Sequence, residues 1–190
     1  MQSFVVALAA LLPLAAASPL GRRDDNKGCQ QAAFHNFAWE VKDFDYHASY
    51  IFTAPAHQNS WGYVNFNLSN PALVYEVQCS GASNQLSDFF YGNIPYTCVG
   101  GPEGTTTQTT FDFSRPSGQL NINQTWVCSD EEPKYPSRFN AWGSANLTLE
   151  CTDKTTTNPD WKLGDVYSDR EVKCTPSNLS MKPYQMSAVA

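Results

Sequence analysis

The sequence has few basic residues, and this shortage excludes one broad class of function. Lysine and arginine number 12 against 18 aspartates and glutamates, which gives a formal net charge of −6. Proteins that bind nucleic acid through its phosphates carry clustered positive charge. The composition therefore predicts no nucleic-acid partner.

Recognisable catalytic and metal-binding motifs are also missing. No two cysteines have the C-x-x-C spacing of zinc sites, and the three histidines, His35, His47 and His57, fit no short ligand motif. The G-x-S-x-G motif of serine hydrolases is absent. We therefore expect no metal, no cofactor and no catalytic residue.

Glycoside hydrolysis is the enzymatic alternative that the composition leaves open. It needs two carboxylates on either side of a cleft, one of them with a raised pKa. The sequence offers several acidic residues but does not bring any two together: Glu40, Asp43, Asp45, Glu76 and Glu150.

Only one hydrophobic stretch is long, and it lies at the N-terminus. Residues 1–17 have the apolar core and small-residue end of a secretory signal peptide. Arg22-Arg23 resembles a dibasic processing site, which makes residues 18–23 a short propeptide. No second segment has the length of a membrane span. We expect a secreted protein, extracellular or in the cell wall, with one domain over residues 24–180 and a flexible tail over residues 181–190.

Cysteines and glycosylation sequons fit this compartment. All six cysteines follow the predicted signal peptide, and disulfides are the expected state outside the cell. Four Asn-x-Ser/Thr sequons predict N-linked glycans at Asn67, Asn123, Asn146 and Asn178.

The rest of the chain has the rhythm of an all-β protein. Short runs of aromatic and β-branched residues alternate with turn residues, and no segment is a convincing amphipathic helix, although residues 83–90 have room for one helical turn. We predict a compact antiparallel β-barrel or sandwich of about nine to eleven strands, stapled by disulfides. The candidate strands are residues 37–42, 49–53, 63–68, 73–79, 95–99, 109–113, 119–128, 144–151 and 166–174.

The sequons test the phase of these strands. In residues 119–128 the apolar Leu120, Ile122 and Trp126 point inward, which turns Asn123 outward. The same phasing turns Asn67 and Asn146, the other two sequon asparagines within predicted strands, toward solvent. A register error of one residue would bury all three, so their agreement supports the phases.

Residues 73–79 alternate apolar and polar side chains, as a half-buried strand does, and end at Cys79. Cys98 follows after a polar and aromatic segment. A disulfide between Cys79 and Cys98 would close a loop of about 20 residues and stabilise the fold by roughly 3 kcal/mol. We expect this bridge to be a structural corner.

The densest polar and aromatic cluster follows Pro55 and contains His57, Gln58, Asn59 and Trp61. Loops on rigid β scaffolds commonly carry recognition, so we interpret this cluster as a candidate recognition loop. The alternative is structural, with Trp61 packed in the mouth of a barrel and its neighbours capping a turn.

Several features of the sequence occur in a distinctive order: Cys29 ten residues before Trp39, the Trp39-Glu40-Val41-x-Asp43-Phe44 segment, Cys79 closing at Tyr96-Thr97-Cys98, and the strand end Trp126-Val127-Cys128. In this order they resemble the Alternaria major-allergen-like family of secreted fungal β-barrel proteins. The resemblance implies a compact antiparallel barrel, secretion, a role as allergen or elicitor of plant defence, and no established enzymatic activity.

The resemblance also bears on the cysteines. Cys79 with Cys98 matches the first intrachain bridge of that family. Cys128 matches one half of the second bridge, but Ala141 stands where the other half is expected. Cys128 is then left with Cys151 or Cys174 as its partner, and hairpin geometry slightly favours Cys174.

That pairing leaves Cys29 with Cys151. Cys29 otherwise matches the family position that joins two chains covalently, so monomer and dimer both stay open.

Two functions from different classes follow. The first is a secreted non-enzymatic protein of effector, elicitor or allergen type that binds an unknown host or cell-wall component, with a small hydrophobic ligand as a further option. The second is a carbohydrate-binding module or small carbohydrate-active hydrolase. A cleft with two inward carboxylates beside exposed aromatic rings would favour the second.

Overall fold

The computed structural model describes residues 28–190, so the predicted signal peptide and propeptide lie outside the described residues. This part of the chain contains one short helix and eleven strands, and no helix in it is long and apolar enough to cross a membrane. The elements are α1 (Cys29–Phe34), β1 (Trp39–Ala54), β2 (His57–Ser69), β3 (Glu76–Ser83), β4 (Tyr96–Thr97), β5 (Gln108–Ser114), β6 (Gln119–Cys128), β7 (Ser137–Asn146), β8 (Cys151–Thr157), β9 (Ser168–Cys174), β10 (Ser177–Met181) and β11 (Pro183–Val189).

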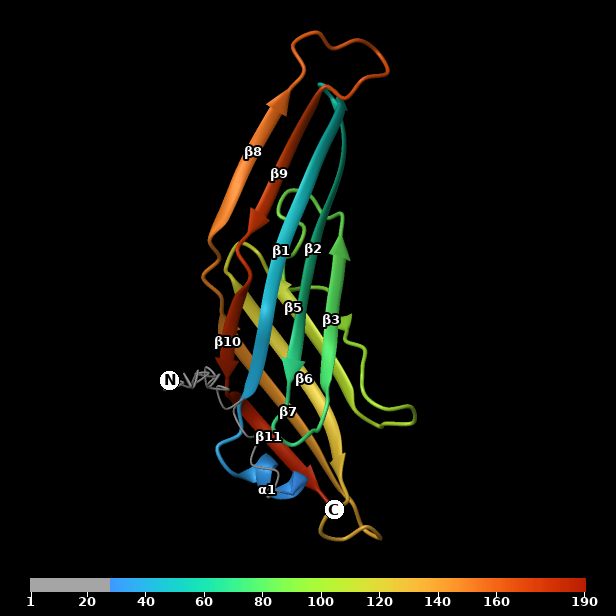
Figure 1. The fold of residues 1–190 in the computed structure, drawn as a ribbon, viewed down its shortest axis with the longest axis vertical. Coiled ribbons are helices and arrows are strands. Elements are labelled where there is room, and N and C mark those ends of the chain that lie inside the picture. The colour runs from blue at the N-terminus through green and yellow to red at the C-terminus, as the bar shows by residue number, and fades with distance from the viewer. Residues whose placement is uncertain (1–27) are drawn as a thin grey trace, which may run out of the picture.

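The strands form two antiparallel sheets. The first, here the β1 sheet, has the order β3-β2-β1-β9-β8, and β10 also pairs with β1; the second, the β6 sheet, has the order β11-β7-β6-β5-β4. Figure 1 shows β5, β6 and β7 behind β1, β2 and β3, while β8, β9 and the adjoining ends of β1 and β2 extend past the second sheet. The all-β prediction is confirmed as a sandwich, and the sheets do not close into a barrel.

Strand β1 organises its sheet because it pairs along almost its whole length. Its first half pairs with β10 and its second half with β9, while β2 follows it throughout. A bulge between Lys42 and Asp45 separates the halves, and Asp43 there has a φ of 54°, which aspartate tolerates better than most residues. The predicted runs 37–42 and 49–53 therefore belong largely to one strand, and between them buried residues such as Tyr46 alternate with outward-facing ones such as His47.

The core between the sheets is mainly aromatic. Trp126 stacks between Phe37 and Phe139, with ring centroids 5.2 and 5.4 Å away. The predicted inward residues of β6 are buried and Asn123 faces outward, so the phase read from the sequence is correct. Burial of this many rings supplies most of the favourable free energy of folding.

Gln124 is a polar exception, because it lies on the inward side of β6 and is fully buried. Its Oε1 accepts hydrogen bonds from Trp39 Nε1 at 2.8 Å and from Asn70 Nδ2 at 2.7 Å. Its Nε2 donates to Thr109 Oγ1 at 2.9 Å. The amide therefore links the β6 sheet to the β1 sheet through a satisfied buried network.

The prediction of one strand over residues 144–151 is wrong. Strand β7 ends at Asn146 and β8 begins at Cys151, in the other sheet. Leu147 N donates to Gly118 O at 2.8 Å as the chain leaves β7. Gly118 has a φ of +70°, and a Cβ there would lie 2.4 Å from Leu147 O, so glycine is required at this crossing.

The predicted flexible tail at residues 181–190 is also wrong. Residues 183–189 form β11, which pairs with β7 and completes the β6 sheet. Most of its side chains are exposed, so the apolar alternation that marks a strand is weak there. The helix α1 was likewise missed because only Ala32 and Ala33 are buried in it, and residues 83–90 form no helical turn.

The disulfides are Cys29–Cys128, Cys79–Cys98 and Cys151–Cys174. The second is the expected corner. The pairing of Cys128 with Cys174 and of Cys29 with Cys151 is wrong because Cys151 and Cys174 are register partners on β8 and β9, with Cα atoms 3.8 Å apart.

Candidate binding surface

The predicted recognition loop is the beginning of a strand. Residues 57–61 open β2, and the turn before them is only Pro55 and Ala56. Because strand side chains alternate, the cluster is divided between two faces. Asn59 and Trp61 face outward, whereas Gln58 turns inward and donates to Ser60 Oγ.

His57 lies at the hairpin turn, where its Nδ1 is 2.7 Å from Thr53 Oγ1 of β1. This contact closes the end of the β1–β2 hairpin. Of the predicted cluster, Asn59 and Trp61 are therefore the members available on the outer face of the β1 sheet.

Two further rings join Trp61 on this outer face. Tyr63 follows it on the same side of β2, and His47 is the register partner of Tyr63 on β1. The His47 and Tyr63 rings stack with centroids 5.1 Å apart and planes 21° apart. Trp61 is 48% exposed and Tyr63 is 37% exposed. We call His47, Tyr63 and Trp61 the aromatic row.

A charged region lies beside the aromatic row. Asp45 Oδ2 is 2.7 Å from His47 Nδ1 and holds that ring in place. Glu171 and Lys173 of β9 complete a surface hollow of about 550 Å³ that Asp45, His47 and Ser49 line from the β1 side. Ligand pockets commonly measure about 300–1,000 Å³, so this hollow has the size for a small ligand or one unit of a polymer.

The sequence did not indicate His47 and Tyr63 as members of this surface. His47 stood out only as a possible metal ligand, and Tyr63 only as a strand residue. The alternation of Trp61 and Tyr63 was a usable signal, because two aromatic side chains at positions i and i+2 share a face. The contribution of β1 depends on register, which no local pattern specifies.

The carboxylates do not form a buried pair. Among residues 28–190 no aspartate or glutamate is buried as a whole residue, although Asp169 Oδ1 is shielded from solvent and has no hydrogen-bond partner. Glu76 forms a surface ion pair with Lys42 at 2.5 Å, and Glu40, Asp43 and Glu150 are exposed. Asp45 and Glu171 both line the hollow beside the aromatic row, and both are partly or fully open to solvent.

Two tyrosines on the inner side of β1 interact with arginines. The guanidinium carbon of Arg115 lies 5.0 Å from the centre of the Tyr46 ring, and that of Arg170 lies 4.7 Å from the centre of the Tyr50 ring. Arg170 also forms two hydrogen bonds to Asp153, which lower the pKa of that carboxyl. These contacts lie on the inner side of the β1 sheet, opposite the aromatic row.

Burial, reinforced by the neighbouring Tyr50, raises the pKa of Tyr46 to about 12. The folded state therefore keeps the Tyr46 proton at a pH where the unfolded chain loses it. The resulting stability is fully present below about pH 10 and is lost as the pH rises toward 12.

We predict that the free energy of unfolding falls less steeply between pH 10 and 12 in Tyr46→Phe than in the unchanged protein. Denaturant titrations across this pH range measure it. Tyr135→Phe, at an exposed tyrosine, is the control and should keep the original slope. Parallel curves for Tyr46→Phe and the unchanged protein would contradict the assignment.

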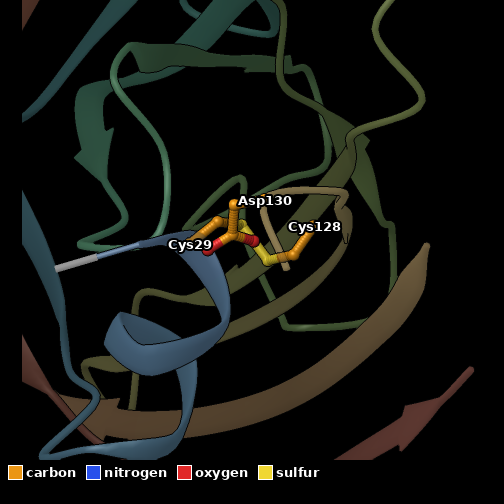
Figure 2. A group of neighbouring side chains, drawn as sticks. All are labelled: Cys29, Cys128 and Asp130. Atoms are coloured by element: carbon orange, nitrogen blue, oxygen red, sulfur yellow. A yellow bond between two sulfur atoms is a disulfide. The ribbon is translucent and has the colours of Figure 1, made fainter. Parts of the chain in front are cut away.

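One group of potential metal ligands lies elsewhere, at the start of α1 (Figure 2). Ligand atoms of Cys29, Cys128 and Asp130 all lie within 4.8 Å of one another. The two sulfurs are bonded to each other, however, so neither is available as the thiolate that a metal needs. Asp130 instead accepts a weak hydrogen bond from Gln30 N at 3.3 Å, which helps to anchor α1.

Together, these features define a disulfide-bonded β-sandwich with an exposed aromatic surface. The sequence profile of the family described as Alternaria alternata allergen 1 matches residues 41–174, and the chain therefore belongs to this family. The resemblance inferred from the sequence is confirmed. No curated protein and no solved structure matched the chain.

Family membership indicates a secreted allergen-like protein, and the three disulfides are consistent with secretion. The family is not a known enzyme family.

Proposed function

We propose that the protein is a secreted, non-enzymatic protein that binds a host or cell-wall component through the outer face of the β1 sheet. The observation that carries the proposal is the aromatic row, in which Trp61 and Tyr63 present half-exposed rings and His47 stacks on Tyr63. Exposed aromatic side chains in one patch mark interaction sites. Tyrosine and tryptophan are also the residues on which binding energy most often concentrates.

Cell-wall polysaccharide is the partner class that the surface favours. Aromatic ring faces pack against the apolar faces of sugar rings, and nearby polar groups then hydrogen-bond the hydroxyls. Asn59 and Asn65 flank the row on β2, and Ser49 is the register partner of Trp61. The open outer face of a sheet suits an extended chain, which needs no enclosed pocket.

A polysaccharide partner makes the secreted binding protein and the carbohydrate-binding module one and the same function. It disfavours the hydrolase. Catalysis would require two carboxylates across a cleft, one of them enclosed; Asp45 and Glu171 line the hollow, but both are partly or fully open to solvent. The proposal thus expects binding without release of reducing sugar.

Cosedimentation with insoluble polysaccharides tests the proposal. The unchanged protein is incubated with cellulose, chitin, β-1,3-glucan and washed plant cell wall, and bound protein and released reducing sugar are both measured. We expect saturable binding to at least one material, and about tenfold weaker binding for Trp61→Ala, since one well-packed aromatic contact contributes about 1.4 kcal/mol.

Trp161→Ala and Tyr135→Ala are matched controls, because both residues lie in connections between strands and outside the aromatic row. They should bind as the unchanged protein does. Equal loss in the controls, or binding unaffected by Trp61→Ala together with Tyr63→Ala, would refute this surface. Reducing sugar released in proportion to protein would refute the non-enzymatic assignment.

A further inference from the structure

The outer face of the β6 sheet carries a second, smaller hollow. It measures about 280 Å³ and is lined by Pro95, Asn121, Asn123, Trp142 and Tyr184 among others. It lies on a different sheet from the aromatic row, so it is independent of the proposed binding function. Its size is just below the usual range of about 300–1,000 Å³ for ligand pockets, which suits one small ring.

One residue lining this hollow is itself a glycosylation acceptor. Asn123 is the first residue of the sequon Asn123-Gln124-Thr125. Gln124 is buried, so Asn123 and Thr125 both lie on the outer face of β6. A glycan attached to Asn123 therefore begins at the edge of a hollow that can receive its first sugar.

The register places an aromatic side chain directly beside the acceptor. Trp142 of β7 is the antiparallel partner of Asn123, so the two side chains project from the same face of adjacent strands. Side chains of such partners lie about 5 Å apart at their Cβ atoms. Tyr184 of β11, which is 70% exposed, stands on the far side of Trp142.

The other three sequons lack such a partner. Asn67 is paired with Lys42 on one side and Gln78 on the other, and Asn146 is paired with Gln119. Asn178 instead accepts a hydrogen bond from Asp43 N at 2.8 Å. A tryptophan in register with the acceptor is thus particular to Asn123 among the four.

We propose that Asn123 carries an N-linked glycan whose first N-acetylglucosamine rests in this hollow, with one ring face against Trp142. Transfer forms a bond between sugar C1 and Asn123 Nδ2, breaks the bond from C1 to the diphosphate of a lipid-linked donor, and releases one Nδ2 proton. The apolar face of the sugar then covers the indole, and its polar substituents meet Asn121, Asp112 and Tyr184.

The present hydrogen bonds of Asn123 allow this attachment. Its Nδ2 donates to Asn140 Oδ1 at 3.1 Å and, more weakly, to Ala141 O at 3.4 Å. Attachment of the sugar replaces one of the two hydrogens on Nδ2. The remaining hydrogen keeps the shorter bond to Asn140, and the longer, weaker bond is the one given up.

The test is a thermodynamic cycle on protein secreted from a eukaryotic host. Glycopeptide mass spectrometry first measures the occupancy of Asn123. The glycans of the unchanged protein and of Asn123→Gln are then trimmed enzymatically to their first sugar, and the melting temperatures of the two proteins are compared by thermal unfolding. We expect occupancy at Asn123 and a melting temperature about 2–4 °C higher with the sugar, the shift that one good aromatic contact gives a domain of this size.

The same comparison in a Trp142→Leu background should show no difference between the two forms. Trp142→Tyr, which keeps an aromatic face, should restore part of the difference and guards against a folding defect of the leucine variant. Asn146→Gln is the matched control and should leave the melting temperature unchanged. An unoccupied Asn123, or a sugar effect that persists in Trp142→Leu, would overturn the proposal.

Discussion

Replacing Cys29 and Cys128 together by serine is expected to lower the free energy of unfolding by about 4 kcal/mol. The bridge spans 99 residues of sequence, the longest separation among the three disulfides. In the chain-entropy description, closing a loop of about 100 residues stabilises a fold by about 4.7 kcal/mol, and native bridges measure about 2–5 kcal/mol. The serine pair also loosens α1, which this bond holds against the end of β6.

Guanidinium unfolding followed by tryptophan fluorescence measures this loss. Serine replacement of Cys151 and Cys174 is the matched control, because that bridge spans only 23 residues and joins strands that already pair. It should cost about 3 kcal/mol. A smaller loss for Cys29 and Cys128 than for the control would contradict this ranking of the bridges.

The second large effect is expected at Gln124. Alanine at this position removes the acceptor for Trp39 Nε1 and Asn70 Nδ2, and the donor to Thr109 Oγ1. Each buried polar group left without a partner costs about 1–3 kcal/mol, and the lost volume adds a cavity. We expect the free energy of unfolding to fall by about 4 kcal/mol.

Gln119→Ala is the matched control, since it removes the same side chain from an exposed position on the same strand. Its effect should stay within about 0.5 kcal/mol. Denaturant titrations of both variants in the same buffer provide the comparison. Similar losses at the two positions would show that the buried network does not hold the sheets together as described.

Gln124 also illustrates where sequence reasoning reached its limit. Alternation in residues 119–128 placed Leu120, Ile122 and Trp126 inward, and the same count places Gln124 inward. A polar residue at an inward position is unfavourable unless partners satisfy it. Trp39 and Asn70 lie 85 and 54 residues away in sequence, so local patterns could not identify them.

The strand content and phases were predictable because burial on one face imposes a period of two on each strand. The disulfide pairing was not, because it depends on where the chain changes sheets. The sequence between Asn146 and Cys151 has the pattern of a continued strand. In the structure the chain changes sheets there, which places Cys151 in the β1 sheet beside Cys174. Strand β11 escaped notice for the related reason that its side chains are mostly exposed.

The candidate surface was partly predictable. The sequence singled out Asn59 and Trp61 within a polar and aromatic cluster, and both are exposed, but the cluster was interpreted as a loop and is the beginning of a strand. The hairpin turn is confined to Pro55 and Ala56, so the cluster alternates between two faces. His47 and Tyr63 entered the surface only through the register of β1 with β2.

The binding proposal is tested most directly by a nuclear magnetic resonance titration with a soluble oligosaccharide of the polysaccharide that cosediments. The protein has five tryptophans, each with one indole N–H signal. Trp61 lies in the aromatic row, Trp142 lines the hollow beside Asn123, Trp161 lies in the connection between β8 and β9, and the other two are in the core. The account predicts that the Trp61 signal shifts with saturation while those of Trp142 and Trp161 stay in place. Shifts at Trp142 or Trp161 without one at Trp61, or no shift at any indole, would contradict it.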